Sequence, residues 1–154
     1  MTYIDKKAAT KSVVEEKMAQ GMSKQDAEQA LLDAGFAMLN AQKIGFIDLK
    51  LMYQILDRRF SGQLAKDMEE AKRQYREVHG LNELLDDYKK EGLKKEESEK
   101  ALIKVLYDSF IEDKVGEPEL LDGLLWSMGY RLKEEFYLDF YAGKNPKLAY
   151  EKDE

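Results

Sequence analysis

The same residue pattern occurs twice in this chain, at a spacing of 71 residues. Residues 21–49 align without a gap with residues 92–120, and 8 of the 29 aligned positions are identical. The identical pairs are Gly21/Gly92, Lys24/Lys95, Glu28/Glu99, Ala30/Ala101, Leu31/Leu102, Lys43/Lys114, Gly45/Gly116 and Leu49/Leu120. A repeat at a fixed period indicates two copies of one supersecondary unit, so both halves of the chain are expected to fold alike.

Both copies have the composition and spacing of α-helices. The chain holds only two prolines and ten glycines, and no segment alternates polar and apolar residues over the length of a strand. Ser23, three residues before Asp26, matches the pattern that caps a helix start. Gly21 and Gly92 are expected to end the preceding helices, because glycine takes positive φ without a steric cost. We therefore predict an all-α protein.

The length predicts a single domain over residues 1–154, because two separate domains of half that size would each be marginally stable. We expect two tandem helical repeats of about 71 residues, covering about 8–78 and 79–143, related by a pseudo-twofold axis. An open solenoid is the weaker alternative, since such arrays usually need three or more repeats. Residues 144–154 are expected to form a polar C-terminal tail.

Several classes of site are excluded by composition. The chain has no cysteine, which removes disulfides, thiolate metal sites and cysteine nucleophiles. Its first residues lack the apolar core of a signal peptide, and no window approaches about 18 consecutive apolar residues. We expect a cytoplasmic protein without a membrane span.

Catalytic and cofactor motifs are absent from the sequence. His79 is the only histidine, and beside Gly80 it is expected to lie at a helix C-terminus rather than in an active site. The loops around Gly45 and Gly116 resemble calcium loops superficially, but they supply too few carboxylates. We predict a non-enzymatic protein with no catalytic residue, no cofactor and no metal. An enzyme would require a carboxylate–tyrosine site among the aromatic residues described below.

The charge pattern argues against direct nucleic-acid binding. The net charge is −6, and basic residues alternate with acidic ones along 66–77. Arg58 and Arg59 stand out slightly, because Arg131 occupies a related position in the second copy. They are candidates for contact with a phosphate or carboxylate, although pairing with neighbouring surface residues is the favoured interpretation.

Aromatic residues accumulate in the second copy and are the best candidates for a specific interaction. The candidate face comprises Trp126, Tyr130, Tyr137 and Tyr141, together with Arg58 and Arg59. Tyrosine and tryptophan are enriched at protein interfaces because they combine apolar area with a polar tip. The alternative, that all four aromatic residues belong to the core or its boundary, is favoured by the small size of the domain.

A second candidate surface is a helix-pairing seam on the helix expected at about 64–78. Apolar residues recur there at alternating spacings of four and three, a heptad pattern. The seam consists of Leu64, Met68, Ala71, Tyr75 and Val78. Such a seam either closes the core or pairs two subunits.

The leading functional hypothesis is therefore a small helical adaptor or regulator that binds another protein or associates with itself. The alternative is a regulator linked to nucleic acid, or an acidic inhibitor of a DNA-acting enzyme from a phage or mobile element. Neither the partner nor the genetic context is specified by the sequence.

Overall fold

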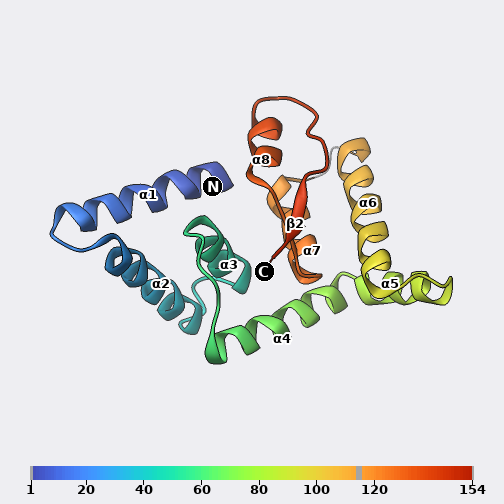
Figure 1. Ribbon diagram of the computed structural model, residues 1–154, viewed down its shortest axis with the longest axis horizontal. Coiled ribbons are helices and arrows are strands. Elements are labelled where there is room, and N and C mark those ends of the chain that lie inside the picture. Colours follow the sequence, from blue (N-terminus) through green and yellow to red (C-terminus); the bar gives the residue numbers. More distant parts are fainter. Residues whose placement is uncertain (1, 114–115, 154) are drawn as a thin grey trace. The chain divides into compact units, whose positions relative to one another are not determined.

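The computed structural model describes residues 2–113 and 116–153 and confirms the all-α class. Its helices and strands are shown in Figure 1. They are α1 (Tyr3–Ala19), α2 (Lys24–Asn40), α3 (Phe46–Ile55), α4 (Gly62–Val78), α5 (Leu81–Lys90), α6 (Lys95–Asp113), α7 (Pro118–Ser127), β1 (Tyr130–Leu132), α8 (Glu134–Tyr141) and β2 (Tyr150–Lys152). In the part of the chain that the structure describes, no helix is both long and apolar enough to cross a bilayer.

The chain divides into two compact units, Met1–Lys66 and Asp67–Glu154, and the boundary falls within α4. We call them unit 1 and unit 2 and describe each by itself. The expectation of a single domain built around a pseudo-twofold axis stays a prediction.

The helices of unit 1 begin at residues whose side chains satisfy free backbone amides. Thr2 Oγ1 accepts the amide of Asp5 at 3.1 Å, and Asp5 Oδ2 accepts the amide of Thr2 at 3.3 Å, which completes a capping box at α1. Ser23 Oγ accepts the amide of Asp26 at 3.1 Å, so this residue caps α2 as the sequence pattern indicates.

The core of unit 1 lies between α1, α2 and α3. Its buried apolar residues are Tyr3, Val14, Ala27, Leu32, Leu49 and Leu51. Gly35 in α2 allows α3 to approach closely, because a Cβ placed there would lie 2.8 Å from both Met52 Cε and Met52 Sδ. This contact was not predictable from the sequence, because it joins residues on different helices.

Unit 2 packs α5, α6, α7 and α8 around a larger core. Pro118 opens α7, where its missing N–H costs nothing, and the amide of Lys94 before α6 donates to Glu97 Oε1 at 3.1 Å. The largest fully buried side chains of the unit are Trp126, Tyr137, Phe136, Met68, Leu102, Ile103, Leu125 and Leu132. Trp126 and Phe136 therefore form the centre of this core.

In the described part of residues 144–154, expected to form a polar C-terminal tail, most side chains are exposed or half-buried, but the segment makes specific contacts with the rest of unit 2. Pro146 is buried, and its carbonyl accepts the hydroxyl of Tyr107 at 2.7 Å. Strand β2 pairs antiparallel with β1, with Arg131 opposite Glu151. The segment is anchored because the amide of Asp153 donates to the carbonyl of Gly129, after α7, and the amide of Lys133, before α8, donates to the carbonyl of Ala149.

Helix positions in the two copies correspond closely. Helix α6 begins 71 residues after α2 (95 − 24), and α7 begins 72 residues after α3 (118 − 46). Gly21 has a φ of +103° and Gly92 a φ of +99°, as expected for glycines that end helices. Whether a duplication produced this correspondence stays a prediction, and the repeat position Lys114 lies outside the described residues.

Candidate functional site

Unit 1 carries a hollow of about 360 Å³ between its three helices. The lining is mostly apolar, from Ala9 and Val13 on α1, Leu31 and Met38 on α2, and Ile44, Leu51, Met52 and Ile55 on or before α3. Lys6, Thr10 and Asp48 lie at its margin. Helices α2 and α3 approach closely at Gly35, and the longer apolar side chains around this contact line the hollow.

A second hollow of about 410 Å³ adjoins the first along α1. Val14 and Met18 of α1 line it with Leu56, and it shares Thr10 and Ile55 with the first hollow. We call the two hollows together the α1–α3 groove. Since they share two residues, one extended ligand can contact both.

Methionines lie at the rim of the α1–α3 groove. Met18 is 42% exposed and Met38 is 43% exposed, and both line the groove. Met22 and Phe36 are further exposed apolar residues of unit 1. Methionine is flexible and polarisable, so an exposed group of this kind adapts readily to an apolar partner.

Charged residues surround the groove unevenly. Lys6 pairs with Asp48 at 3.6 Å, which compensates both charges. Lys11 and Lys24 line the second hollow and form no ion pair with any residue that the structure describes. Lys7, Glu15 and Glu28 line it as well, and Glu28 lies 3.7 Å from Arg58 Nη1. The rim therefore offers two ammonium groups to acidic residues of a ligand.

The two arginines proposed from the sequence behave as surface residues. Arg58 Nη2 donates to Gln29 Oε1 at 2.7 Å, and its Nη1 lies 3.7 Å from Glu28 Oε1. Burial raises the pKa of the nearby Tyr53, and the positive charge of Arg58 opposes that rise. Arg59 is exposed. Surface pairing, the favoured interpretation, is what the structure shows for Arg58.

Three of the four aromatic candidates are buried, so they lie in the core, which was the favoured interpretation, and not on an interaction face. Trp126 is 1% exposed, Tyr130 is 3% exposed and Tyr137 is 0% exposed. Tyr141 is half-buried, and its hydroxyl lies 2.8 Å from both carboxylate oxygens of Glu119. The physical reason is that unit 2 is small and fills its core with its largest side chains.

Tyr137 forms a second carboxylate–tyrosine pair, beside that of Tyr141 with Glu119. Its hydroxyl donates to Asp122 Oδ2 at 2.6 Å, and Asp122 Oδ1 accepts the amide of Leu132 at 2.8 Å. Both side chains are fully buried, so this pair connects α7, β1 and α8 and is closed to a substrate.

The proposed helix-pairing seam is only partly accessible. Met68 is buried, and Tyr75 packs edge-on against Trp126 with ring centroids 6.1 Å apart. Leu64 and Ala71 are half-buried, whereas Val78 is 81% exposed. His79 follows the end of α4, and its ring lies 4.3 Å from that of Tyr75. The seam residues of unit 2 from Met68 to Tyr75 are therefore largely used within the chain.

Asp122 is a structural residue that the sequence interpretation missed. The signal was present, because Asp122 is an isolated acid in the apolar run from Leu120 to Trp126. A carboxylate on the buried side of a helix must have hydrogen-bond partners, which in this fold are Leu132 and Tyr137.

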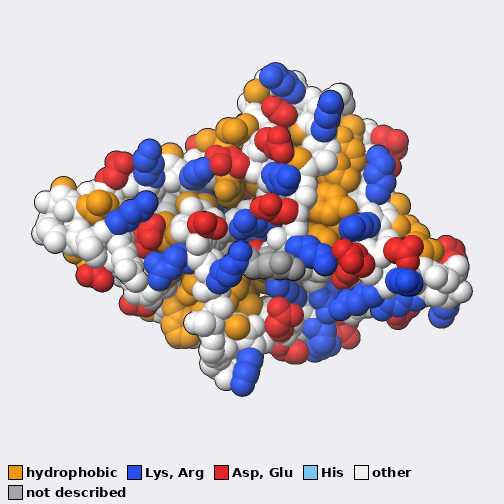
Figure 2. Space-filling model, in the orientation of Figure 1, with side chains coloured by type: hydrophobic (Ala, Val, Ile, Leu, Met, Phe, Trp, Pro, Cys, Tyr) orange, Lys and Arg blue, Asp and Glu red, His pale blue; other side chains and the backbone are white. Residues whose placement is uncertain are grey.

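Positive and negative side chains are interspersed over the face shown in Figure 2. In the described part of the chain, no three acidic or histidine side chains gather as metal ligands would. Comparisons with protein-family models, with curated proteins and with solved structures gave no match to this chain.

Proposed function

We propose that the protein acts by binding another protein, and that the α1–α3 groove receives an amphipathic helix of that partner. The observation that carries the proposal is the apolar lining of two adjacent hollows with exposed methionines at their rim. Helix-in-groove recognition uses such surfaces, with apolar anchors spaced three and four residues apart along the ligand.

The charges at the rim specify the chemistry of the partner helix. Lys11 and Lys24 favour a ligand with acidic residues beside its apolar stripe. Complementary rim charges mainly increase the association rate and restrict the choice of partner, while the apolar anchors supply most of the affinity. The proposed activity is therefore recognition and not catalysis.

The test is a selection of helical peptides that bind the full-length protein, followed by NMR mapping of the contact. We expect the selected peptides to combine an apolar stripe with acidic flanks and to shift resonances of α1, α2 and α3. Met18→Glu and Met38→Glu place a carboxylate at the rim and should each weaken binding about tenfold. Both residues are exposed, so the fold should tolerate the changes.

The matched control is Val105→Glu, because Val105 is an exposed apolar residue of α6 in unit 2. This variant should bind the peptides like the unmodified protein. The proposal is wrong if the three variants bind alike, or if the peptides map to unit 2. A concentration-dependent dimer in sedimentation that Met38→Glu abolishes would identify a second copy of the chain as the occupant and would also overturn it.

A further inference from the structure

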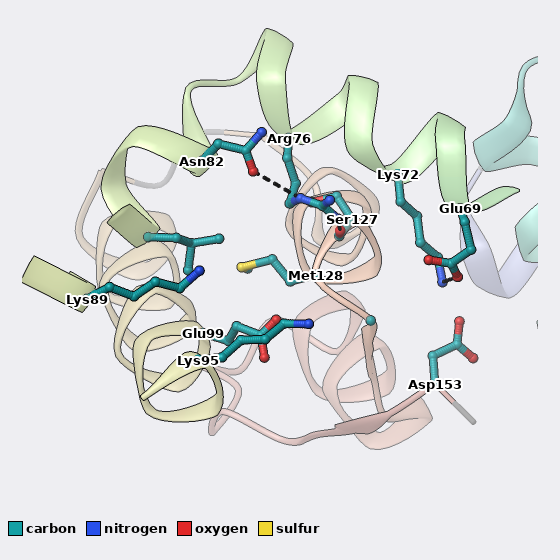
Figure 3. Close-up of a pocket in the computed structure, with 12 residues that line it drawn as sticks. Glu69, Lys72, Arg76, Asn82, Lys89, Lys95, Glu99, Ser127, Met128 and Asp153 are labelled. Carbon is teal, nitrogen blue, oxygen red and sulfur yellow. Dashed lines mark hydrogen bonds and ion pairs between the residues drawn. The ribbon is translucent and has the colours of Figure 1, made fainter. Parts of the chain in front are cut away.

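Unit 2 contains a polar cavity of about 370 Å³ that the protein-binding proposal does not use (Figure 3). Four helices, the turn after α7 and the C-terminal segment contribute to its walls. The charged residues that line it are Glu69, Lys72, Arg76, Lys89, Lys95, Glu99 and Asp153. Its volume falls within the range of small-molecule sites, roughly 300–1,000 Å³.

Arg76 is the most constrained cation of this cavity. Its side chain is partly buried, Nε donates to Asn82 Oδ1 at 3.1 Å, and Nη1 donates to the carbonyl of Ser127. Both acceptors are neutral, and Arg76 forms no ion pair with any described residue. The C-terminal end of α7 at Ser127 attracts the guanidinium but offsets only part of its charge. Nη2 makes no hydrogen bond to a described residue, so its donors are available to an anion.

Two lysines add to this positive charge. Lys89 comes from the last turn of α5 and Lys95 is the first residue of α6, and neither is ion-paired in the described part of the chain. Figure 3 shows their amines and the Arg76 guanidinium directed into the space around Met128. Lys72 differs, because it lies 3.2 Å from the carboxylate of Glu69 and is compensated.

Of the remaining carboxylates, Asp153 is placed to contact a different part of a ligand. Glu99 Oε1 accepts the hydroxyl of Tyr130 at 3.4 Å, and burial together with the charge of Glu99 raises the pKa of that tyrosine to about 12. Asp153 lines the cavity from the C-terminal segment. In Figure 3, Glu99 lies beside Lys95, whereas Asp153 and Glu69 lie apart from Arg76, Lys89 and Lys95. Carboxylates in this position accept hydrogen bonds from hydroxyl groups.

We propose that this cavity binds a small phosphate monoester whose other end carries hydroxyl groups. The phosphate lies against Arg76, Lys89 and Lys95, and a hydroxyl group at the other end donates to Asp153. A guanidinium fixed by two acceptors presents its remaining donors at low entropic cost, which favours phosphate recognition. The cavity is larger than an inorganic phosphate requires, so the ester portion contributes contacts.

Calorimetry with the full chain tests this site, with ribose 5-phosphate, ribose and inorganic phosphate as probes. We expect ribose 5-phosphate to bind with a submillimolar Kd, inorganic phosphate about tenfold more weakly, and ribose without detectable heat. Equal binding of ribose and ribose 5-phosphate would overturn the proposal. So would the absence of binding by ribose 5-phosphate at millimolar concentration.

Substitutions locate the binding site. Arg76→Gln should weaken the binding of ribose 5-phosphate about tenfold or more. Arg76→Lys should have an intermediate affinity, because it keeps the positive charge but loses the paired donors of the guanidinium. Lys104→Gln is the matched control, since Lys104 lies on α6 outside the cavity and pairs with Asp108 at 2.7 Å. If Arg76→Gln fails to fold, the double variant Lys89→Gln with Lys95→Gln decides, because both lysines are exposed. If the folded variants bind ribose 5-phosphate with unchanged affinity, the proposal is wrong. It is also wrong if Lys104→Gln loses as much affinity for ribose 5-phosphate as they do.

Discussion

At the scale of single residues, Asp122 shows how one buried carboxylate organises unit 2. It lies on α7, accepts the amide of Leu132 in β1 and accepts the hydroxyl of Tyr137 in α8. Burying a charge costs several kcal/mol unless hydrogen bonds compensate it. If the carboxylate were removed, the buried amide of Leu132 and the buried hydroxyl of Tyr137 would both lose this acceptor.

Replacement of Asp122 by alanine should therefore destabilise the protein strongly. We expect the free energy of unfolding to fall by about 3 kcal/mol, because two buried donors lose this acceptor. Urea denaturation followed by circular dichroism measures the change. The control is Asp108→Ala, which removes an exposed carboxylate paired with Lys104 and should cost less than about 1 kcal/mol. Equal effects of the two substitutions would show that the contacts of Asp122 do not stabilise the fold.

Residue roles were predictable where neighbours in the chain decide them. Ser23 caps α2 and Gly21 takes a positive φ, because each responds to residues within one helical turn. The positions of Tyr130 and Tyr137 were not predictable in the same way. The acceptor of the Tyr137 hydroxyl is Asp122, 15 residues away in the chain, so helical spacing alone could not separate core from surface.

At the scale of elements, the contact of α2 with α3 depends on one missing side chain. A Cβ at Gly35 would lie 2.8 Å from Met52 Sδ and 3.1 Å from Leu49 Cδ1. Protein interiors are packed densely, so a branched side chain there must displace α3 or force Met52 from its position. The glycine thus sets the distance between two helices that form the α1–α3 groove.

Gly35→Val should lower the free energy of unfolding by about 2 kcal/mol through this overpacking. The matched control is Ala34→Val, one position earlier on the same helix and exposed, which should cost only about 0.5 kcal/mol from helix propensity. Chemical denaturation of both variants provides the comparison. A loss no larger for Gly35→Val than for Ala34→Val would refute the packing argument.

Helix starts were predictable from capping residues, but β2 was not. A strand of three residues, Tyr150–Lys152, carries too little pattern to be distinguished from a polar tail. Its formation depends on the partner strand β1, which begins 20 residues earlier (150 − 130). The presence of β2 therefore depends on its pairing with a distant segment, and the composition of residues 150–152 alone does not predict it.

At the scale of the whole molecule, the two proposed binding sites belong to different units. The α1–α3 groove is built by unit 1 alone, and the polar cavity by unit 2 alone. Helical periodicity indicated that many faces are apolar, which was sufficient to predict the all-α class. It could not predict which faces meet, and both sites arise where faces of different helices meet.

Removal of residues 150–154 should destabilise unit 2 selectively. The deletion eliminates the pairing of β2 with β1 and the contact between the rings of Tyr130 and Tyr150. In hydrogen exchange, we expect protection of α7 and β1 amides to fall about tenfold, while α1–α3 amides stay unchanged. Lys144→Ala, an exposed substitution before the deleted segment, serves as the control. Equal loss of protection in both units would mean that they unfold as one.

The hydrogen bond from Leu132 to Asp122 has a consequence for the behaviour of the protein in concentrated solution. Successive amides of a strand point to opposite sides, and the amide of Lys133 donates to Ala149 beside β2. The amide of Leu132 points the other way, where a further strand from another molecule could pair with it. Because Asp122 already accepts this amide, the amide is not available to a further strand, and α7 in this way occupies a pairing position at the edge of β1.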